Sequence, residues 1–271
     1  MARPVTESPA GDKLLVVDVG NTQTHFGIFD AGGDRVVEHW RFATVRESTS
    51  DEVGAALGNL LELRGFGFSD IGRSIISSTV PQLSEQWQLA AARYLEHEML
   101  LVGPAIKTGM PIRIDNPREV GADRLVNAVA AYERYRAACI VVDFGTAITY
   151  DVVSDEGEYL GGIITPGAEI SLEALSDRAA KLPRVEFLEP RALIGKSTVE
   201  AIRSGIAYGY AGQVEGIVRR LRDELGEHTP VIATGGLAKP LTPFMRETID
   251  AVDEFLTLTG LRLIWERNSG R

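Results

Sequence analysis

The residues Leu14-Leu15-Val16-Val17-Asp18-Val19-Gly20-Asn21-Thr22-Gln23-Thr24-His25-Phe26-Gly27-Ile28-Phe29 decide how this chain folds. An apolar run long enough for one buried strand leads into a carboxylate, a tight Gly-Asn turn and two threonines, and a second strand-like run follows. A near-copy occurs later as Cys139-Ile140-Val141-Val142-Asp143-Phe144-Gly145-Thr146-Ala147-Ile148-Thr149-Tyr150. Asp143 follows Asp18 by 125 residues (143 minus 18). The duplication predicts two related half-domains whose hairpins face each other.

The atoms of such a hairpin suit a nucleotide phosphate. A glycine turn leaves backbone N–H groups unshielded, and these can hold phosphate oxygens. The threonine hydroxyls add donors, whereas the aspartate would be repelled by a phosphate and is better placed to hold a cation or its water shell. The alternative is an ordinary hairpin in which Asp and Asn only stabilise the turn. Two copies at matched spacing favour a clamp for a nucleoside triphosphate and its metal.

Composition and charge exclude several classes of protein. At 271 residues the chain is long enough for two domains. A net charge of −10 and a pI near 5.0 argue against a nucleic-acid-binding surface, so an anionic substrate has to be met by local donors. The single cysteine, Cys139, permits no internal disulfide. No apolar run reaches the length of a membrane span, which is about 20 residues. We therefore expect a cytoplasmic protein without nucleic-acid or membrane partners, preceded by a disordered lead-in over residues 1–12.

The order of predicted elements repeats once along the chain. After the first hairpin, the sequence predicts a third strand at 35–42, a helix from Ser50, a strand at 74–78, a helix carrying Leu83, Trp87 and Leu89, and a strand at 98–102. The second half predicts strands near 138–143, 147–153 and 158–165, a helix, a longer helix at 198–225, a strand at 231–234, a short strand near Ala251 and a last helix. The order βββαβαβ is typical of an RNase H-like half-domain. The predicted fold is α/β, with half-domains at 13–135 and 136–271 across a nucleotide cleft.

A helix before the second hairpin carries a carboxylate and a guanidinium side by side. Apolar residues recur at helical spacing from Leu125, and the helix begins either near Asn116 or anew at Gly121. In both cases Asp123 and Arg124 lie near its amino terminus, where a carboxylate is favoured by the helix dipole. They could be no more than solvated first-turn residues. A base beside a fixed guanidinium would also suit a substrate with a hydroxyl to deprotonate and an anionic tail.

Four motifs together resemble those of one protein family. Asp18–Thr22, Gly121–Arg124, Asp143–Thr149 and the glycine-rich turn Gly161–Gly167 occur in the order found in type III pantothenate kinase, within the acetate and sugar kinase/Hsp70/actin superfamily. The resemblance runs from about Leu14 to Gly236. It implies an actin-like ATPase fold and the ATP-dependent phosphorylation of pantothenate to 4′-phosphopantothenate, the first step of coenzyme A biosynthesis.

The resemblance also implies a role for each motif. Asp123 would be the general base, Asp143 would bind a monovalent cation (K⁺ or NH₄⁺), and Asp18 would lie near the Mg²⁺ of ATP. The other ATP-binding residues would be Val19, Gly20, Asn21, Thr22, Gln23, Thr24, His25, Thr146, Gly235 and Gly236. Pantothenate would also contact Gly121, Ala122, Arg124 and, from the partner subunit of a homodimer, Thr198.

One position departs from the family, and two other functions remain open. Ile114 stands where members usually carry a tyrosine that lines the pantothenate pocket, which bears on substrate affinity. A non-catalytic nucleotide-sensing module would use the same hairpins. A sugar or acetate kinase, or a kinase for another small carboxylate-bearing alcohol, would share the superfamily; Arg124 beside Asp123 favours a substrate with a carboxylate over a sugar.

Overall fold

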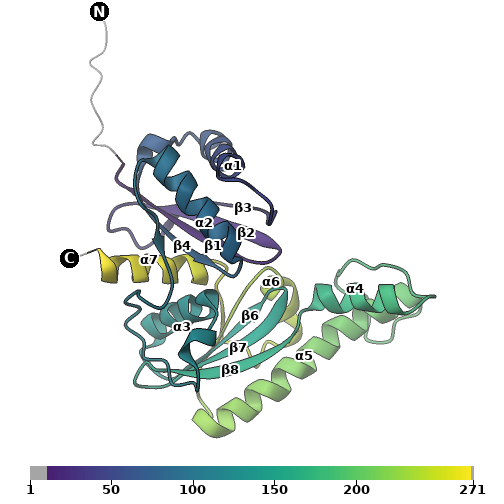
Figure 1. Ribbon diagram of the computed structural model, residues 1–271. Coiled ribbons are helices and arrows are strands. Elements are labelled where there is room, and N and C mark those ends of the chain that lie inside the picture. Colours follow the sequence, from purple (N-terminus) through teal and green to yellow (C-terminus); the bar gives the residue numbers. More distant parts are fainter. Residues whose placement is uncertain (1–10, 270–271) are drawn as a thin grey trace, which may run out of the picture. The chain divides into compact units, whose positions relative to one another are not determined.

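The computed structural model describes residues 11–269, and these form two compact units (Figure 1). Unit 1 contains the residues up to 109, residues 120–126 and the residues from 257 on; unit 2 contains residues 110–119 and 127–256. The predicted lead-in lies, apart from its last two residues, outside the described residues. The chain crosses between the units more than once, whereas the sequence indicated a single boundary between residues 135 and 136.

Unit 1 contains a five-stranded sheet of order β3-β2-β1-β4-β5. The first three strands are antiparallel neighbours, and β4 and β5 run parallel to β1. The strands are β1 (Lys13–Val19), β2 (Gln23–Phe29), β3 (Val36–Ala43), β4 (Ile71–Ser78) and β5 (Leu100–Leu101). Its helices are α1 (Ser50–Glu62), α2 (Pro81–Ala90), which continues as a π-helical turn at Ala91–Leu95, and α7 (Leu256–Asn268).

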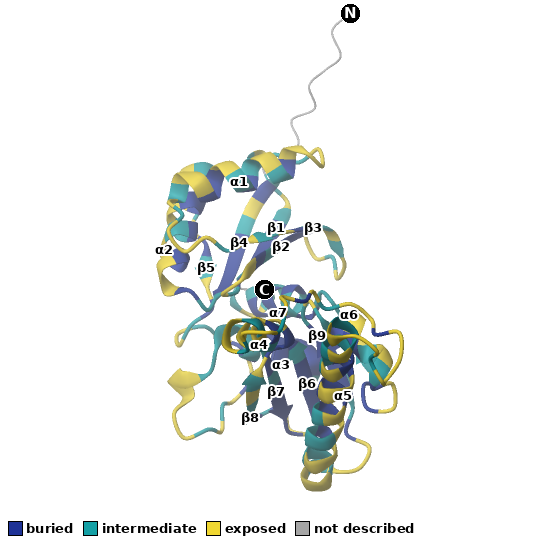
Figure 2. Ribbon diagram, turned by 90° about the vertical axis from the view of Figure 1, so that its right-hand side faces the viewer, coloured by how far each residue is buried: buried dark blue, intermediate teal, exposed yellow. Residues whose placement is uncertain are grey.

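Both faces of this sheet are covered. Leu15, Val17 and Val19 of β1 pack with α1 and α2 in one apolar cluster. The alternate residues of β2 point the other way, toward α7: a Cβ atom added to Gly27 would lie 2.9 Å from Leu258 Cδ1, and Arg262 lies over the Phe29 ring. Figure 2 shows β1 and β2 buried along most of their length. The carboxyl-terminal helix therefore belongs to unit 1 because it covers the second face of that sheet.

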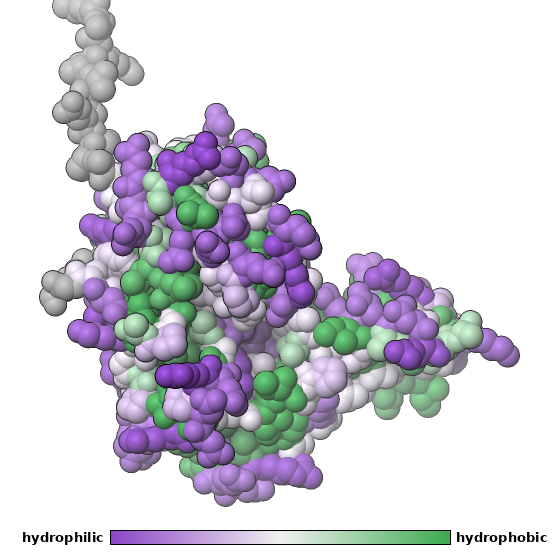
Figure 3. Space-filling model, in the orientation of Figure 1, coloured by the Kyte–Doolittle hydropathy of each residue, from purple (hydrophilic) through white to green (hydrophobic). Residues whose placement is uncertain are grey.

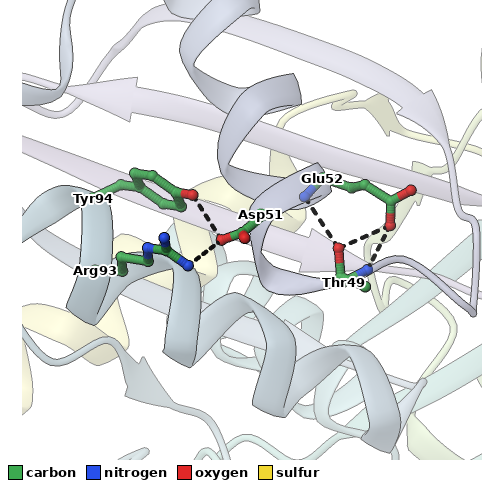
Figure 4. A network of polar contacts seen from close by, with 5 residues as sticks. All are labelled: Thr49, Asp51, Glu52, Arg93 and Tyr94. Atoms are coloured by element: carbon green, nitrogen blue, oxygen red, sulfur yellow. Dashed lines mark hydrogen bonds and ion pairs between the residues drawn. The ribbon is translucent and has the colours of Figure 1, made fainter.

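Local sequence explains where α1 begins. Thr49 Oγ1 accepts a hydrogen bond from the backbone N–H of Glu52 (3.3 Å), and the Glu52 carboxylate accepts one from the backbone N–H of Thr49 (2.8 Å) (Figure 4). This reciprocal capping box satisfies two N–H groups that a helix start leaves unpaired. Asp51 accepts from Arg93 and from the Tyr94 hydroxyl, each at 2.7 Å, which ties α1 to the segment after α2.

Unit 2 repeats the topology of unit 1. Its sheet has the order β8-β7-β6-β9-β10, with β6, β7 and β8 antiparallel neighbours and β9 and β10 parallel to β6. The strands are β6 (Cys139–Phe144), β7 (Ala147–Val153), β8 (Tyr159–Pro166), β9 (Val231–Thr234) and β10 (Ala251–Val252). Other helices of the chain are α3 (Ala122–Tyr135), α4 (Ala168–Arg178), α5 (Thr198–Leu225) and α6 (Ala238–Leu241). The identical strand order confirms the two related α/β half-domains predicted from the duplicated hairpin.

Candidate functional site

In unit 1 the register places a row of polar residues across four neighbouring strands. Asp18 of β1 is paired with His25 of β2 on one side and with Ser77 of β4 on the other, and His25 is paired in turn with Arg41 of β3. Paired residues of neighbouring strands point to the same face of a sheet. Ser77 is fully buried, and its hydroxyl has no hydrogen-bond partner among the residues described. The sequence had indicated no role for Ser77, although it lies near the carboxyl end of the strand beside Asp18, where ligands of α/β sheets commonly bind.

The turn after β1 is tight and exposed. The backbone N–H of Gly20 donates to Gln23 O at 3.0 Å, and a Cβ atom at Gly20 would lie only 3.0 Å from that oxygen. The side-chain amide of Asn21 donates to Thr79 Oγ1 (3.4 Å), while Asn21 Oδ1 accepts from Arg46 Nη2 (3.2 Å). The backbone N–H of Asn21 donates to no acceptor within residues 11–269, which leaves it available to an anion.

His25 and Thr24 are more enclosed than this turn. Thr24 is buried, and its hydroxyl lies 3.0 Å from the hydroxyl of Thr44. His25 Nε2 lies 3.3 Å from His39 Nδ1. Burial, with smaller contributions from the Arg41 charge and from His39, lowers the pKa of His25 to about 3. His25 is therefore a neutral hydrogen-bonding group at physiological pH and adds no positive charge for a phosphate.

The first turn of α3 holds the predicted base. The helix starts at Ala122, so the second of the two predicted starts, at Gly121, is confirmed, and Pro117–Glu119 forms a separate 3₁₀ turn. A Cβ atom at Gly121 would lie 2.5 Å from Asp123 Oδ1, so glycine leaves room for this carboxylate. Burial raises the pKa of Asp123, opposed by the backbone N–H of Arg124, which donates to Oδ1 at 2.9 Å, and by the Arg124 charge. A raised carboxyl pKa is typical of a general base.

In unit 2, Asp143 occupies the place that Asp18 has in unit 1. It is paired with Thr149 of β7 and Thr234 of β9. Asp143 Oδ2 accepts a hydrogen bond from the buried Asn127 at 3.1 Å. Gly235 has a φ of +92°, and a Cβ atom there would lie 2.4 Å from Asp143 Oδ1. Gly235 is thus required by its conformation and by its approach to the carboxylate, and Asn127 is a positioning residue that the sequence had not singled out.

The remaining predicted residues of unit 2 fall into two places. Gly167, the residue before α4, donates its N–H to Thr146 O at 3.0 Å, so the β6–β7 turn adjoins the start of that helix. A Cβ atom at Gly236 would meet no atom within 4 Å, so its surroundings are open. Thr198 is exposed as the first residue of α5, next to the capping Ser197. Ile114 lies beside Gly161, where an added Cβ atom would be 3.3 Å from Ile114 Cγ2.

Two features bear on metal and membrane binding. Within residues 11–269, no three His, Cys, Asp or Glu side chains are arranged to hold a metal ion. A magnesium ion that travels with a nucleotide needs only one or two carboxylates in addition to the phosphate oxygens, so it requires no such cluster. Among the described helices, none combines the length and the hydrophobicity of a transmembrane span.

Comparison with known proteins gives one consistent result. A family model described as type III pantothenate kinase matches residues 14–220. The type III pantothenate kinase of Syntrophus aciditrophicus is 53% identical over 94% of this chain and 100% of its own length, and that of Geobacter sulfurreducens is 52% identical over 94% and 99%. Among solved structures, a candidate 2-dehydro-3-deoxygalactonokinase from Sinorhizobium meliloti has a similar fold, with a TM-score of 0.59 at 14% identity over 95% of this chain and 97% of that one.

Proposed function

The chain belongs to the type III pantothenate kinase family, and we propose how its residues carry out that family's reaction, the ATP-dependent phosphorylation of pantothenate in coenzyme A biosynthesis. The match extends over nearly the whole length of relatives at about half identity, so the reaction type and the predicted two-half-domain, actin-like fold are those of the family. The roles of individual residues are argued below from the geometry of each unit.

Asp123 is the general base of this proposal. The observation that carries it is the half-buried carboxylate in the first turn of α3, whose pKa is raised by burial and whose space is kept open by Gly121. The carboxylate takes the proton of the primary hydroxyl of pantothenate while that oxygen attacks the γ-phosphorus, and ADP leaves with the electrons of the broken P–O bond. Arg124 pairs with the carboxylate of pantothenate, and Gly121 and Ala122 bring backbone close to the substrate.

The two hairpin turns hold the triphosphate. Residues 18–25 supply backbone N–H groups and hydroxyls to the phosphates, and Asp18 faces the Mg²⁺ that accompanies ATP. Thr146, Gly235 and Gly236 contact ATP, and Asp143 binds K⁺ or NH₄⁺, which supplies positive charge near the phosphates. Two features support this role: Asn127 donates a hydrogen bond to one oxygen of the Asp143 carboxylate, and the absence of a side chain at Gly235 leaves room for the other oxygen. Because ATP is made and used in the cytoplasm, we place the reaction there.

A homodimer completes the pantothenate site in this proposal. Three glycines of α5, at positions 205, 209 and 212, would each accept a Cβ atom without meeting anything within 4 Å, so no other part of the described chain covers them. Nearby apolar side chains are exposed, including Leu193 (62%) and Ile194 (79%) just before α5. Figure 3 shows hydrophobic residues at the surface of this part of unit 2. A second copy of α5 would cover them and present Thr198 to the site of its partner.

One assay tests the reaction and its rivals. ADP release from MgATP is measured with pantothenate, acetate or a hexose as acceptor, in potassium and in sodium buffer. Pantothenate should be the acceptor that supports turnover. Release with acetate or a hexose alone would assign another kinase activity of the superfamily, and tight ATP binding without release for any acceptor would assign a nucleotide sensor.

A further inference from the structure

The loop between β3 and α1, residues 44–49, makes three hydrogen bonds to residues 21–24, which form the turn after β1 and the start of β2. The backbone N–H of Thr44 donates to Thr22 O at 2.9 Å, and the Thr44 hydroxyl lies 3.0 Å from that of Thr24. Farther along, Arg46 Nη2 donates to Asn21 Oδ1 at 3.2 Å. The loop is closed by a bond from Ser48 N to Val45 O at 3.1 Å, and Thr49 caps α1 (Figure 4). Arg46 thus stands at the tip of a short loop that is fixed at both ends.

Arg46 carries a charge that its own chain does not neutralise. Two exposed arginines of unit 1 pair with carboxylates, Arg64 with Glu38 and Arg93 with Asp51. Within the described residues Arg46 forms no ion pair, and Asn21 Oδ1 is its only hydrogen-bond acceptor. A guanidinium has five N–H donors, so most of those on Arg46 are available to a ligand. The chain has a net charge of −10, so an anionic ligand depends on local positive groups. A guanidinium without an ion pair beside the predicted anion-binding turn is such a group.

Asn21 is held so that it can steer this guanidinium. Its amide nitrogen donates to Thr79 Oγ1 (3.4 Å), and Thr79 in turn donates both its N–H (2.9 Å) and its hydroxyl (3.2 Å) to Val19 O at the end of β1. This chain of bonds fixes the amide with Oδ1 toward Arg46. The side chain of Arg46 is therefore oriented before any ligand binds, which lowers the entropic cost of using it.

We propose that Arg46 binds a phosphate group of ATP beside the Gly20–Thr22 turn and that Asn21 positions its guanidinium for this contact. The inference rests on the proposed function, because it takes this turn to be the one that receives the phosphates. The planar fork of an arginine can donate to a phosphate oxygen with one edge while another N–H stays on Asn21. Arg46 adds a positive charge where the neutral His25 adds none.

The test compares binding of MgATP and of adenosine by isothermal titration calorimetry. Arg46→Ala should weaken MgATP binding about tenfold, the loss expected for one charge-assisted hydrogen bond, and should leave adenosine binding unchanged. Arg46→Lys keeps the positive charge but lacks the planar guanidinium, so its affinity for MgATP should lie between those of wild type and Arg46→Ala. The matched control is Arg35→Ala, which removes an exposed arginine from the β2–β3 connection at the other end of the same strands and should bind like wild type. Equal binding by Arg46→Ala and Arg35→Ala, or an equal loss for adenosine and MgATP, would overturn the inference.

A second measurement separates a phosphate contact from a purely structural role. If Arg46 only oriented Asn21, Arg46→Ala would have no further effect on MgATP binding in an Asn21→Ala background. A loss that persists in that background, although smaller because Asn21 no longer orients the guanidinium, supports direct contact, and a loss that vanishes completely refutes it.

Turnover of the wild-type protein with pantothenate is measured in parallel. Wild type without turnover would contradict the proposed function, whereas an active wild type with an unaffected Arg46→Ala would contradict only this inference.

Discussion

At the scale of single residues, the two carboxylates of α3 and β6 differ in their surroundings and hence in their chemistry. Asp123 accepts a hydrogen bond from the backbone N–H of Arg124, and burial raises its pKa. Asp143 accepts a side-chain amide from Asn127 and has Gly235 against its other oxygen. A carboxylate with a raised pKa suits proton transfer, and a carboxylate is also the kind of oxygen ligand that cations prefer.

Asp123→Asn should lower turnover by about 100-fold or more, because the amide keeps the shape but cannot accept the proton. Steady-state kinetics with pantothenate measures the change. Asp34→Asn, at an exposed aspartate of the β2–β3 connection, serves as the control and should leave turnover unchanged. If Asp123→Asn turned over like this control, Asp123 would be only a first-turn residue of α3.

The same substitution makes a prediction about stability and pH. The folded-state pKa of Asp123 is raised above its ordinary value of 3.8. The protonated side chain is favoured in the folded state, so its contribution is present in full below the ordinary pKa and is lost as pH rises through the folded-state pKa. Asp123→Asn cannot ionise and should be more stable than wild type at neutral pH. In urea unfolding the difference should disappear in acid; a difference that grows in acid would contradict the direction of the shift.

The sequence predicted the aspartates of the candidate site but not the residues that lie beside them in the folded chain. Asp18 and Asp143 were predicted because each stands two residues before a glycine in a pattern that occurs twice, and Asp123 because it adjoins Arg124 near the start of a predicted helix. Asn127 and Ser77 were not, since an asparagine within a helix and a serine within a strand carry no local pattern. Their positions follow from helix packing and strand register, which place Asn127 within hydrogen-bond distance of Asp143 and Ser77 opposite Asp18. Only the folded chain supplies such pairings.

At the scale of elements, the β6–β7 turn is held by three other segments. Asn127 reaches it from α3, Gly235 from the end of β9, and Gly167 from the start of α4.

The bounds predicted for β7, β9 and α5 are confirmed to the residue, because apolar patterning and turn residues mark their ends. The short α6 and the π-helical turn after α2 were not predicted, since neither is long enough to show a period. Of the three apolar residues named for this helix, Leu83 and Trp87 are buried and Leu89 is exposed.

Because we propose that Asp143 holds a monovalent cation beside this turn, we expect the catalytic rate to depend on that cation. At constant ionic strength the rate should rise steeply with K⁺ or NH₄⁺ and little with Na⁺. Asp143→Ala should abolish that dependence, because no carboxylate would remain at this position to hold the ion. Asn127→Ala should shift the dependence to higher K⁺ by releasing one carboxylate oxygen. Equal rates in sodium and potassium buffers would rule out a cation role for Asp143.

At the scale of the whole molecule, the duplicated sheets account for the architecture, and α5 is the helix at which we propose that two copies associate. Both units have the same strand order, as the two copies of the hairpin motif in the sequence predicted. The carboxyl-terminal helix was expected in the second half-domain, and its place in unit 1 follows from contacts with Gly27 and Phe29 that are distant in sequence. The exposed glycines of α5 meet no such partner within residues 11–269. Figure 2 shows the exposed residues of this helix in yellow.

The proposed homodimer predicts a mass in solution of about twice 29.4 kDa by light scattering at micromolar concentration. Gly209→Leu should dissociate it, because the added side chain would fill the space into which a second helix packs. Glu215→Leu adds a similar side chain to an exposed position on another side of α5 and should leave the dimer intact. A wild-type monomer with full activity would refute the assembly.

Mixing two impaired variants tests whether Thr198 acts in the site of the partner subunit. Asp123→Asn and Thr198→Ala homodimers should both be weak, each because all of its sites lack one group. A mixed dimer has one site with Asp123 from one subunit and Thr198 from the other, so statistical exchange of subunits should restore about a quarter of wild-type activity. If Thr198 served the site of its own subunit, every site in the mixture would lack one of the two groups. Activity would then stay at the average of the separate variants, and the shared site would be excluded.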